Sequence, residues 1–492
     1  MPIKILNDFK KKEITEDNVI IGSGAGGSTT AYELLKSGKS SIILEEGPSV
    51  EFEEKKKVGN RITKFYKNNG ATPIYSFSGG PLIGYGQGSC VGGSTFINGG
   101  YFSTTPEWIF DPWIKEKKVN FSYEEFKMYL NEIRSEINVT SVELKDIDKD
   151  SKVLLDGSKK FNWKIEKCER FLKDCKRNNL CVIGCPSDSK QSMNVTYHKK
   201  LHENKIDIIH SCSVNKIIFN NGVATHLIAK NKIDNQNYKI KFKNLFINCG
   251  PINTPHLLIK NKLIKYQKNQ SDFEFHMNFK IVVKFKEKVY SNLSTVSIYF
   301  VREFEKEGAL LSAANSEIPY LLATLSHSDI NTKNDLYENF SNYALYIYQI
   351  KARSRGQVKN FMGVPYVSYN FDDFDYYQIQ EAIKRTSKLF LSQGAEFIIY
   401  PIENAKKVYS LKDADDLIQN IKIKKLHLIS VHGMGSARSG VESNSITDYF
   451  GKLKNFKNIF INDASILPGA TGESPQASIM AFAKHNVKNN KY

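Results

Sequence analysis

Three glycines and one acid near the N-terminus have the types and the spacing to bind a dinucleotide. Gly22, Gly24 and Gly27 directly follow the apolar residues 19–21. A turn of this kind lets the backbone approach a pyrophosphate, and the helix after it directs its N-terminus at the negative charge. Glu45 ends the next apolar run, roughly 20 residues later, where a carboxylate accepts hydrogen bonds from a ribose diol. An acid here disfavours a 2′-phosphate, so these residues predict NAD or FAD rather than NADP.

The C-terminal part of the chain holds a second group of residues suited to chemistry. An apolar run at residues 459–462 ends in Asp463, a glycine turn follows, and a helix is predicted from about Pro475. This helix would also direct its N-terminus at a negatively charged ligand. His432, within HGMGSARSG, is a candidate catalytic residue. A single histidine is more often an ordinary core or surface residue, so a catalytic role for His432 depends on the residues that flank it.

The pattern of apolar residues along the chain predicts a fold of both helices and strands, which would position these residues. Residues 19–21 and 42–44 are typical of parallel strands buried on both faces, and residues 206–250 alternate as in a β-meander. Long alternating runs, among them residues 276–285 and 320–326, indicate a second, antiparallel sheet. The predicted fold class is therefore α/β, or α+β overall: a Rossmann-like cofactor-binding domain with a β-meander, interleaved with an antiparallel-sheet substrate domain.

The two domains are predicted to alternate along the chain, because no low-complexity linker separates them. The segments assigned to the cofactor-binding domain are residues 1–105, 165–270 and 410–492. Residues 106–164, where aromatic side chains recur at helical spacing, are predicted to form a helical insertion, and residues 271–409 the substrate-binding domain. After a sharp turn at Gly250, a short helix is predicted to begin near Thr254.

Length, composition and net charge limit the classes of protein to which this chain can belong. With 492 residues, of which 41% are hydrophobic, the chain is long enough for two or more folding units. The net charge of +17 could suggest nucleic acid or a membrane surface, but lysine is spread along the chain and mixed with asparagine. We therefore expect solvated lysine faces, no nucleic-acid partner and no stable membrane insertion. The first residues lack the apolar core of a secretory signal, and no run approaches the roughly 18 apolar residues of a membrane span, so a cytoplasmic protein is expected.

Four of the seven cysteines lie between Cys168 and Cys185, and this number in so long a chain predicts no disulfide framework. Cys185 and Pro186 imitate the end of a ferredoxin motif, so an iron–sulfur cluster must be considered. The tight CxxCxxC portion is missing, however, and so is the paired CxxC spacing of zinc sites. Buried or loop thiols without a metal are therefore expected.

Four blocks in order resemble the glucose–methanol–choline oxidoreductase family, flavoenzymes that oxidise alcohols to carbonyls with FAD. The blocks are VIIGSGAGG with ILEEG, GSCVGGSTFINGG, LFINCGPINTPHLL, and HGMGSARSG with FINDASILPGATGESPQASIMAFA. The resemblance implies FAD rather than NAD as the cofactor. VGGSTFINGG and GCPSDSK are more loosely similar to the branch of cholesterol oxidases and long-chain alcohol oxidases.

The resemblance implies a role for the second block and for one strand. Ser94, Asn98 and Gly99 match the loop that passes the flavin ring near N5, where backbone N–H groups and small side chains stabilise the anionic reduced flavin. Val214 matches a position where the backbone of a strand contacts the adenine.

In the fourth block, Asp463 matches an acid near the ribityl and pyrophosphate portion of FAD, and Gln476 and Ala477 begin a helix aimed at the pyrimidine edge of the flavin. The full set of predicted cofactor-binding residues is Gly22, Gly24, Gly26, Gly27, Glu45, Gly93, Ser94, Asn98, Gly99, Val214, Gly250, Asp463, Gln476 and Ala477.

His432 matches the active-site histidine of the family, which accepts or orients the proton of the substrate hydroxyl while hydride leaves to flavin N5. Ser474 departs from the pattern, since most members have His or Asn at that position. A serine hydroxyl still makes one hydrogen bond but cannot replace histidine as a base. Three interpretations follow: His432 acts with Ser474 and Glu473 in support, the reaction differs from alcohol oxidation, or FAD binding persists without turnover.

The sequence thus predicts an FAD-dependent oxidoreductase that acts on a CH–OH group of an alcohol, polyol, sugar or sterol, with His432 and Ser474 as the catalytic residues. The alternative is a flavin-binding protein of the same fold with altered or lost alcohol oxidation. The partner is expected to be a small molecule with a hydroxyl group, while oxygen, a quinone and a protein all stay open as the electron acceptor.

Overall fold

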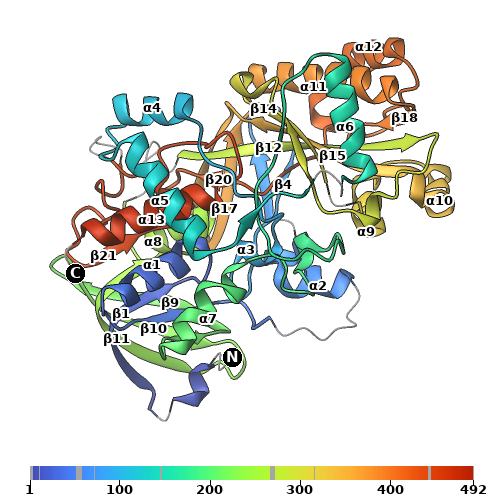
Figure 1. Cartoon of the computed structure of the whole chain (residues 1–492). Coiled ribbons are helices and arrows are strands. Elements are labelled where there is room, and N and C mark those ends of the chain that lie inside the picture. The colour runs from blue at the N-terminus through green and yellow to red at the C-terminus, as the bar shows by residue number, and fades with distance from the viewer. Residues whose placement is uncertain are drawn as a thin grey trace.

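The computed structural model describes residues 4–9, 11–50, 58–70, 72–143, 147–265, 272–314, 316–440, 445–490 and 492. Its strands form a seven-stranded sheet and a twelve-stranded sheet, with helices packed around both (Figure 1). In Figure 1 the first sheet lies at the lower left, below the C-terminal helix α13 (Gln476–Asn489), and the long strand β12 (Asp272–Phe285) of the second sheet lies at the upper right. The predicted fold class is confirmed.

The seven-stranded sheet has the order β8-β2-β1-β11-β10-β9, and β21 also pairs with β11. The strands are β1 (Glu13–Ile21), β2 (Ile42–Leu44), β8 (Asp207–Ile209), β9 (Cys212–Asn220), β10 (Val223–Asn231), β11 (Asn237–Ile247) and β21 (Ile459–Ile461). β11 joins two patterns: residues 237–241 pair antiparallel with β10, whereas residues 239–247 pair parallel with β1 and residues 245–247 pair parallel with β21. The predicted β-meander is confirmed as β9, β10 and β11.

The twelve-stranded sheet is built around β12. β12 pairs antiparallel with β15 along residues 276–284, and it also forms antiparallel pairs with β16, β20, β19 and β18. Its strands besides β12 are β3 (Thr72–Ser76), β4 (Ile83–Tyr85), β6 (Ile165–Lys167), β13 (Tyr299–Val301), β14 (Ala309–Ala313), β15 (Tyr343–Lys351), β16 (Arg355–Phe361), β17 (Val364–Asn370), β18 (Ala395–Ile399), β19 (Leu428–Ser430) and β20 (Gly433–Met434). A pair of short strands, β5 (Val139–Thr140) and β7 (Arg170–Phe171), stands apart.

Helices cover both sheets. Those of eight residues or more are α1 (Ala25–Lys36), α2 (Val58–Phe65), α4 (Glu107–Lys115), α5 (Tyr123–Glu136), α6 (Lys149–Lys160), α8 (Gly250–Lys260), α10 (Ile330–Glu338), α11 (Asp373–Ser392), α12 (Leu411–Asn420) and α13; the shorter ones are α3 (Ser94–Ile97), α7 (Tyr197–Glu203) and α9 (Ile318–Thr324). In the part of the chain that the structure describes, no helix combines the length and the apolar character that crossing a bilayer requires.

The sheets divide the chain differently from the predicted boundaries. β3, β4, β6, β19 and β20 fall in segments assigned to the cofactor-binding domain, yet they pair within the twelve-stranded sheet. The predicted helical insertion also divides, because α5 packs on α13 whereas α6 packs on α11. Short strands and single helices carry no local signal for the sheet they join, since the partner is chosen by tertiary packing.

Two local predictions differ from the structure. Residues 320–326, predicted as a strand, lie largely in α9, where Leu321 and Leu325 are four residues apart and both buried; a short apolar run fits either period. The helix predicted near Thr254 begins at Gly250 as α8. Pro255 lies inside α8 and has no N–H for the carbonyl of Pro251, which instead accepts a hydrogen bond from Ser436 Oγ at 2.5 Å.

A buried ammonium group joins three helices of the cofactor-binding half. The side chain of Lys484 on α13 is inaccessible to solvent, and its Nζ lies 2.6 Å from Glu33 Oε1 on α1 and 2.8 Å from Glu136 Oε1 on α5. Lys36 also contacts Glu33 at 2.6 Å, so the glutamates share two cations. The network locks α13, and therefore its N-terminus, against the first sheet.

Replacing Lys484 with alanine should destabilise the protein strongly, because Glu33 would keep only the half-exposed Lys36 as a partner. We expect a loss of about 3 kcal/mol in the free energy of unfolding, measured by urea denaturation. Lys488→Ala is the matched control: Lys488 also pairs from α13, with Glu132, but is solvent-exposed, so the loss should stay below about 1 kcal/mol. Equal losses in the two variants would contradict the role of Lys484.

Candidate active site

The glycine-rich turn between β1 and α1 leaves space at one position and is closed by packing at others. A Cβ on Gly24 would meet no atom within 4 Å. In contrast, a Cβ on Gly26 would stand 2.0 Å from the carbonyl oxygen of Asn462, and one on Gly27 would stand 1.9 Å from that of Gly22. The open space at Gly24 lies at the N-terminus of α1, whose N–H groups favour a negative charge, so the turn fits a pyrophosphate.

Further glycines bring distant segments to this turn. A Cβ on Gly93, just before α3, would stand 3.0 Å from Gly24 Cα, and one on Gly22 would stand 2.2 Å from the carbonyl oxygen of Asn248, just after β11. Gly250 has a φ of +85°, which glycine adopts readily, and it opens α8. With Asn462 beside Gly26, all four sequence blocks therefore meet around the first turn.

Two buried carboxylates lie at the carboxyl ends of parallel strands. Glu45, after β2, accepts hydrogen bonds from Ser23 N at 3.0 Å, Ser23 Oγ at 2.6 Å and Gly47 N at 2.8 Å. Burial raises the pKa of Glu45, while these three donors oppose the rise. A carboxylate has about four acceptor positions, so Glu45 keeps one for a ligand hydroxyl.

Asp463, after β21, is more fully engaged. Its Oδ2 accepts from Gly250 N at 2.7 Å and Thr254 Oγ1 at 2.5 Å, and its Oδ1 accepts from the N and Oγ of Ser465 at 2.8 and 2.5 Å. Burial raises the pKa of Asp463 against these donors. With all four positions used by the protein, the side chain ties α8 to the last turn, and contact of this residue with a cofactor is left to its backbone.

The predicted flavin loop and the start of α13 are bonded to each other. Asn98 Nδ2 donates to Gln476 Oε1 at 2.7 Å, and Asn98 Oδ1 accepts from Gly100 N at 3.0 Å. Ser94 Oγ accepts from Gly88 N at 3.0 Å, whereas Ala477 is fully buried in the core. Two residues 378 positions apart in sequence are thus brought together at the N-terminus of α13.

Sequence reasoning missed two buried cations that hold the same loop. Lys190 Nζ donates to the carbonyl oxygens of Phe96 and Asn98 at 2.6 and 2.8 Å, and burial lowers the pKa of Lys190 to about 8. Arg170 donates to the carbonyl oxygen of Gly99 through Nη2 at 2.7 Å and Nε at 3.1 Å. The only sequence signal was that Lys190 ends the GCPSDSK stretch.

Val214 lies in β9, opposite Ala229 of β10, at an irregularity in the pairing of the two strands. Lys216 pairs with Ile228, so Asn215 is an extra residue between the two registered pairs. Such a bulge leaves backbone groups outside the ladder. Backbone available for a ligand is therefore found next to the predicted adenine contact.

His432 lies between β19 and β20 and faces a second histidine, which sequence reasoning also missed. His276, on β12, is inaccessible to solvent, and its Nδ1 lies 3.1 Å from Nδ1 of His432. The backbone joins them too, since His276 N donates to the carbonyl oxygen of His432 at 3.1 Å. Burial lowers the pKa of His432 to about 4, and it lowers the pKa of His276 well below its ordinary value, so the pair is neutral at pH 7.

The loop just before α13 is bonded to strands of the second sheet. Gly472 N donates to His276 Nε2 at 3.2 Å, and its carbonyl oxygen accepts from Gln349 Nε2 on β15, also at 3.2 Å. Glu473, predicted as a possible support for His432, instead pairs with Arg302 through both carboxylate oxygens, at 2.6 and 3.1 Å. Ser474 is half-buried, and its hydroxyl has no hydrogen-bond partner among the described residues.

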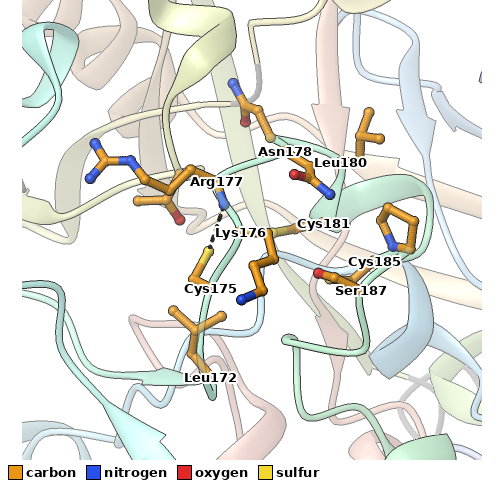
Figure 2. A pocket seen from close by; sticks show the side chains of 12 residues that line it. Leu172, Cys175, Lys176, Arg177, Asn178, Leu180, Cys181, Cys185 and Ser187 are labelled. Atoms are coloured by element: carbon orange, nitrogen blue, oxygen red, sulfur yellow. Dashed lines mark hydrogen bonds between the residues drawn. The ribbon is translucent and has the colours of Figure 1, made fainter.

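The cysteines, all seven of which are described, are free thiols. Cys175, Cys181 and Cys185 line a small cavity in the loop after β7, and Figure 2 shows Arg177 N donating to Cys175 Sγ beside it, at 3.4 Å. The cavity volume of about 10 Å³ is close to the minimum for one water molecule. Within the described residues, the side chains close enough to share one metal ion are Glu33, Glu132 and Glu136, and the ammonium group of Lys484 already lies among them.

Comparison with known proteins identifies the family of this chain. Sequence profiles of the GMC oxidoreductase family match residues 16–268 and 352–483. The chain belongs to the GMC oxidoreductase family. Members of this family bind FAD, which agrees with the open space at Gly24 and the free acceptor position of Glu45.

Relatives of this GMC oxidoreductase are distant. An uncharacterised GMC-type oxidoreductase of Sinorhizobium fredii, y4nJ, is 27% identical over 96% of this chain and 94% of its own length. The long-chain-alcohol oxidase FAO3 of Arabidopsis thaliana is 22% identical over 95% of this chain and 66% of its own length.

Solved structures share the fold. Pyridoxine 4-oxidase from Mesorbium loti superposes with a TM-score of 0.73 at 12% identity, over 96% of this chain and 98% of its own. A variant of formate oxidase from Aspergillus oryzae gives 0.76 at 14% identity, over 97% and 99%.

Gly24→Val should separate cofactor binding from folding. The new side chain enters open space, so we expect the apo protein to unfold at about the wild-type urea concentration while the purified protein loses most of its flavin. Gly26→Ala is the contrasting variant, because its Cβ would stand 2.0 Å from a backbone oxygen and should lower the stability of the apo protein itself. Wild-type flavin content in Gly24→Val would contradict the assignment of the turn to the cofactor.

Proposed function

We propose that this GMC oxidoreductase oxidises a CH–OH group of a small molecule to a carbonyl, with His432 hydrogen-bonded to the reacting oxygen. When bound, FAD supplies the acceptor for the hydride. The chain's own residues would hold the pyrophosphate at Gly24, the ribose at Glu45, and the flavin beside Asn98 and Gln476.

One continuous set of contacts supports this proposal. His432 contacts His276, His276 accepts from Gly472 N, and Gly472 lies four residues before Gln476, which binds Asn98. The histidine is therefore coupled through a single short loop to the helix N-terminus and the loop predicted to border the flavin. In the fold, this is the junction of the two sheets.

Neutral His432 suits a hydroxyl or carbonyl oxygen better than a carboxylate, which an imidazolium would pair with. Buried Arg170 and Lys190 face the carbonyl oxygens of the flavin loop and place positive charge behind it. Such charge favours an anionic cofactor once it has taken up hydride. The long-chain-alcohol oxidases among the relatives agree with this chemistry, although their substrates are not thereby those of this chain.

A second candidate is a flavin-binding protein that does not oxidise alcohols. It is favoured by one observation: where the family pattern has His or Asn, this chain has Ser474, which has no hydrogen-bond partner among the described residues, and the neighbouring Glu473 is paired with Arg302. The hydroxyl of Ser474 can still hydrogen-bond a substrate oxygen, and His432 already has a partner in His276. We therefore favour alcohol oxidation.

His432→Ala should keep flavin in the protein but slow its anaerobic reduction by the best substrate by about 100-fold, since a group at the reacting oxygen is lost. The substrate is first sought among long-chain alcohols, sterols, polyols and sugars by bleaching of the oxidised flavin spectrum. His427→Ala, at an exposed histidine of the same segment, is the matched control. If dithionite reduces the flavin and no alcohol does, the second candidate function replaces the first.

The reduction rate should show no step due to His432 between about pH 5.5 and pH 7.5, because its pKa is lowered from 6.5 to about 4. The sign for stability follows from the same shift. Between about pH 4 and pH 6.5 the unfolded chain binds the proton and the folded chain does not, so the free energy of unfolding falls as the pH drops through this window. Stopped-flow reduction across the pH range checks the first point, and a step near pH 6.5 that is absent from His432→Ala would contradict it.

A further inference from the structure

The two facing histidines have their protons assigned by a backbone group. Gly472 N–H can only donate, so the Nε2 atom of His276 that it contacts at 3.2 Å must accept and carries no proton. Neutral His276 therefore has its proton on Nδ1. That nitrogen lies 3.1 Å from Nδ1 of His432, which must in turn be the acceptor.

We propose that His276 is a positioning residue that fixes neutral His432 as the Nε2–H tautomer, so that His432 presents a hydrogen-bond donor, and not a basic nitrogen, to the oxygen of the substrate. The proposal rests on the proposed function only in taking the substrate oxygen as the group that Nε2 meets. The order of the protons follows from the contacts of His276 alone.

The opposite order of protons is disfavoured by geometry. A bare Nε2 on His432 would require a proton on its Nδ1 and therefore an accepting Nδ1 on His276. The remaining proton of His276 would then lie on Nε2, where it would face Gly472 N–H, two donors 3.2 Å apart. A buried donor without an acceptor is destabilising, and here two would arise.

The surroundings of the pair also disfavour a doubly protonated histidine. Lys351, on the neighbouring strand β15, lowers the pKa of His276 by charge repulsion, and His432 does the same if it is protonated. Glu473, next to Gly472 in sequence, is paired with Arg302, and Glu274 on β12 accepts from Ala470 N at 2.8 Å. These two carboxylates, on the segments that carry Gly472 and His276, are thus engaged elsewhere.

A donor at His432 has a definite chemical consequence. It hydrogen-bonds an oxygen that carries negative charge more strongly than a neutral hydroxyl, so it stabilises the substrate oxygen as an alkoxide. Because both nitrogens of His432 are engaged, the hydroxyl proton passes to solvent water, and the hydride leaves the carbon for the flavin. The chain departs from the family pattern at Ser474. The pair of His276 and His432 gives it a different means of orienting the substrate oxygen.

Nuclear magnetic resonance of the flavin-loaded protein, labelled with ¹⁵N at histidine only, tests the tautomer directly. At neutral pH we expect a proton on Nδ1 of His276, a scalar coupling across the hydrogen bond to Nδ1 of His432, and a proton on Nε2 of His432. His432→Gln and His276→Phe assign the signals by their loss. A proton on Nδ1 of His432 would overturn the proposal, whether or not any alcohol reduces the flavin.

His276→Phe provides the second measurement, because it keeps a ring and removes both nitrogens. We expect unchanged flavin content and a loss of roughly 10- to 100-fold in the rate of flavin reduction, as His432 loses its orientation. His485→Phe, at a buried histidine that stacks on Phe121, is the matched control and should stay close to wild type. A wild-type rate in His276→Phe would overturn the positioning role, while inactivity of the wild-type protein towards every alcohol would reject the proposed function and leave the spectroscopic result standing.

Discussion

The hydrogen bond from the backbone N–H of Gly472 to His276 is the contact on which the geometry of the site depends. It joins the segment before α13 to the central strand β12, and thereby sets the position of α13 relative to the second sheet. Gly472 has a φ of +75°, a backbone conformation that favours glycine, whereas the nearest atom to a Cβ there is Ile109 Cδ1, the movable end of a side chain, at 2.6 Å. The two sheets are thus held together next to His432, the proposed catalytic residue.

Burial of charged and polar groups is the general means by which the site is made rigid. Glu45 and Asp463 are held by backbone and hydroxyl donors, Arg170 and Lys190 by carbonyl oxygens, and Lys484 by three glutamates. A buried polar group that has all its partners allows few alternative arrangements, since each alternative would leave one unpaired. The lowered pKa of His432 and the raised pKa of Asp463 result from the same exclusion of water.

Local signals in the sequence were reliable where one element forms its own structure. The glycine turn, the β-meander and the start of α13 follow from residue types that suit only one backbone conformation. The signals failed where tertiary contacts determine the structure. Leu321 and Leu325 fit a strand and a helix equally, and β3 and β4 are too short to specify which sheet they join. In both cases the deciding contacts are with residues far away in the chain.

The sequence by itself determined the family, the cofactor class, the mixed fold and the identity of His432 as a candidate, because these depend on motifs whose residues lie next to one another. Only the tertiary structure brought Asn98 to Gln476, placed Arg170 and Lys190 behind the predicted flavin loop, and paired His276 with His432. His276 lies within an alternating strand, where the sequence gives no reason to distinguish it from its neighbours. The direction of its proton is decided by an amide nearly 200 residues away, a contact that exists only after both sheets have formed.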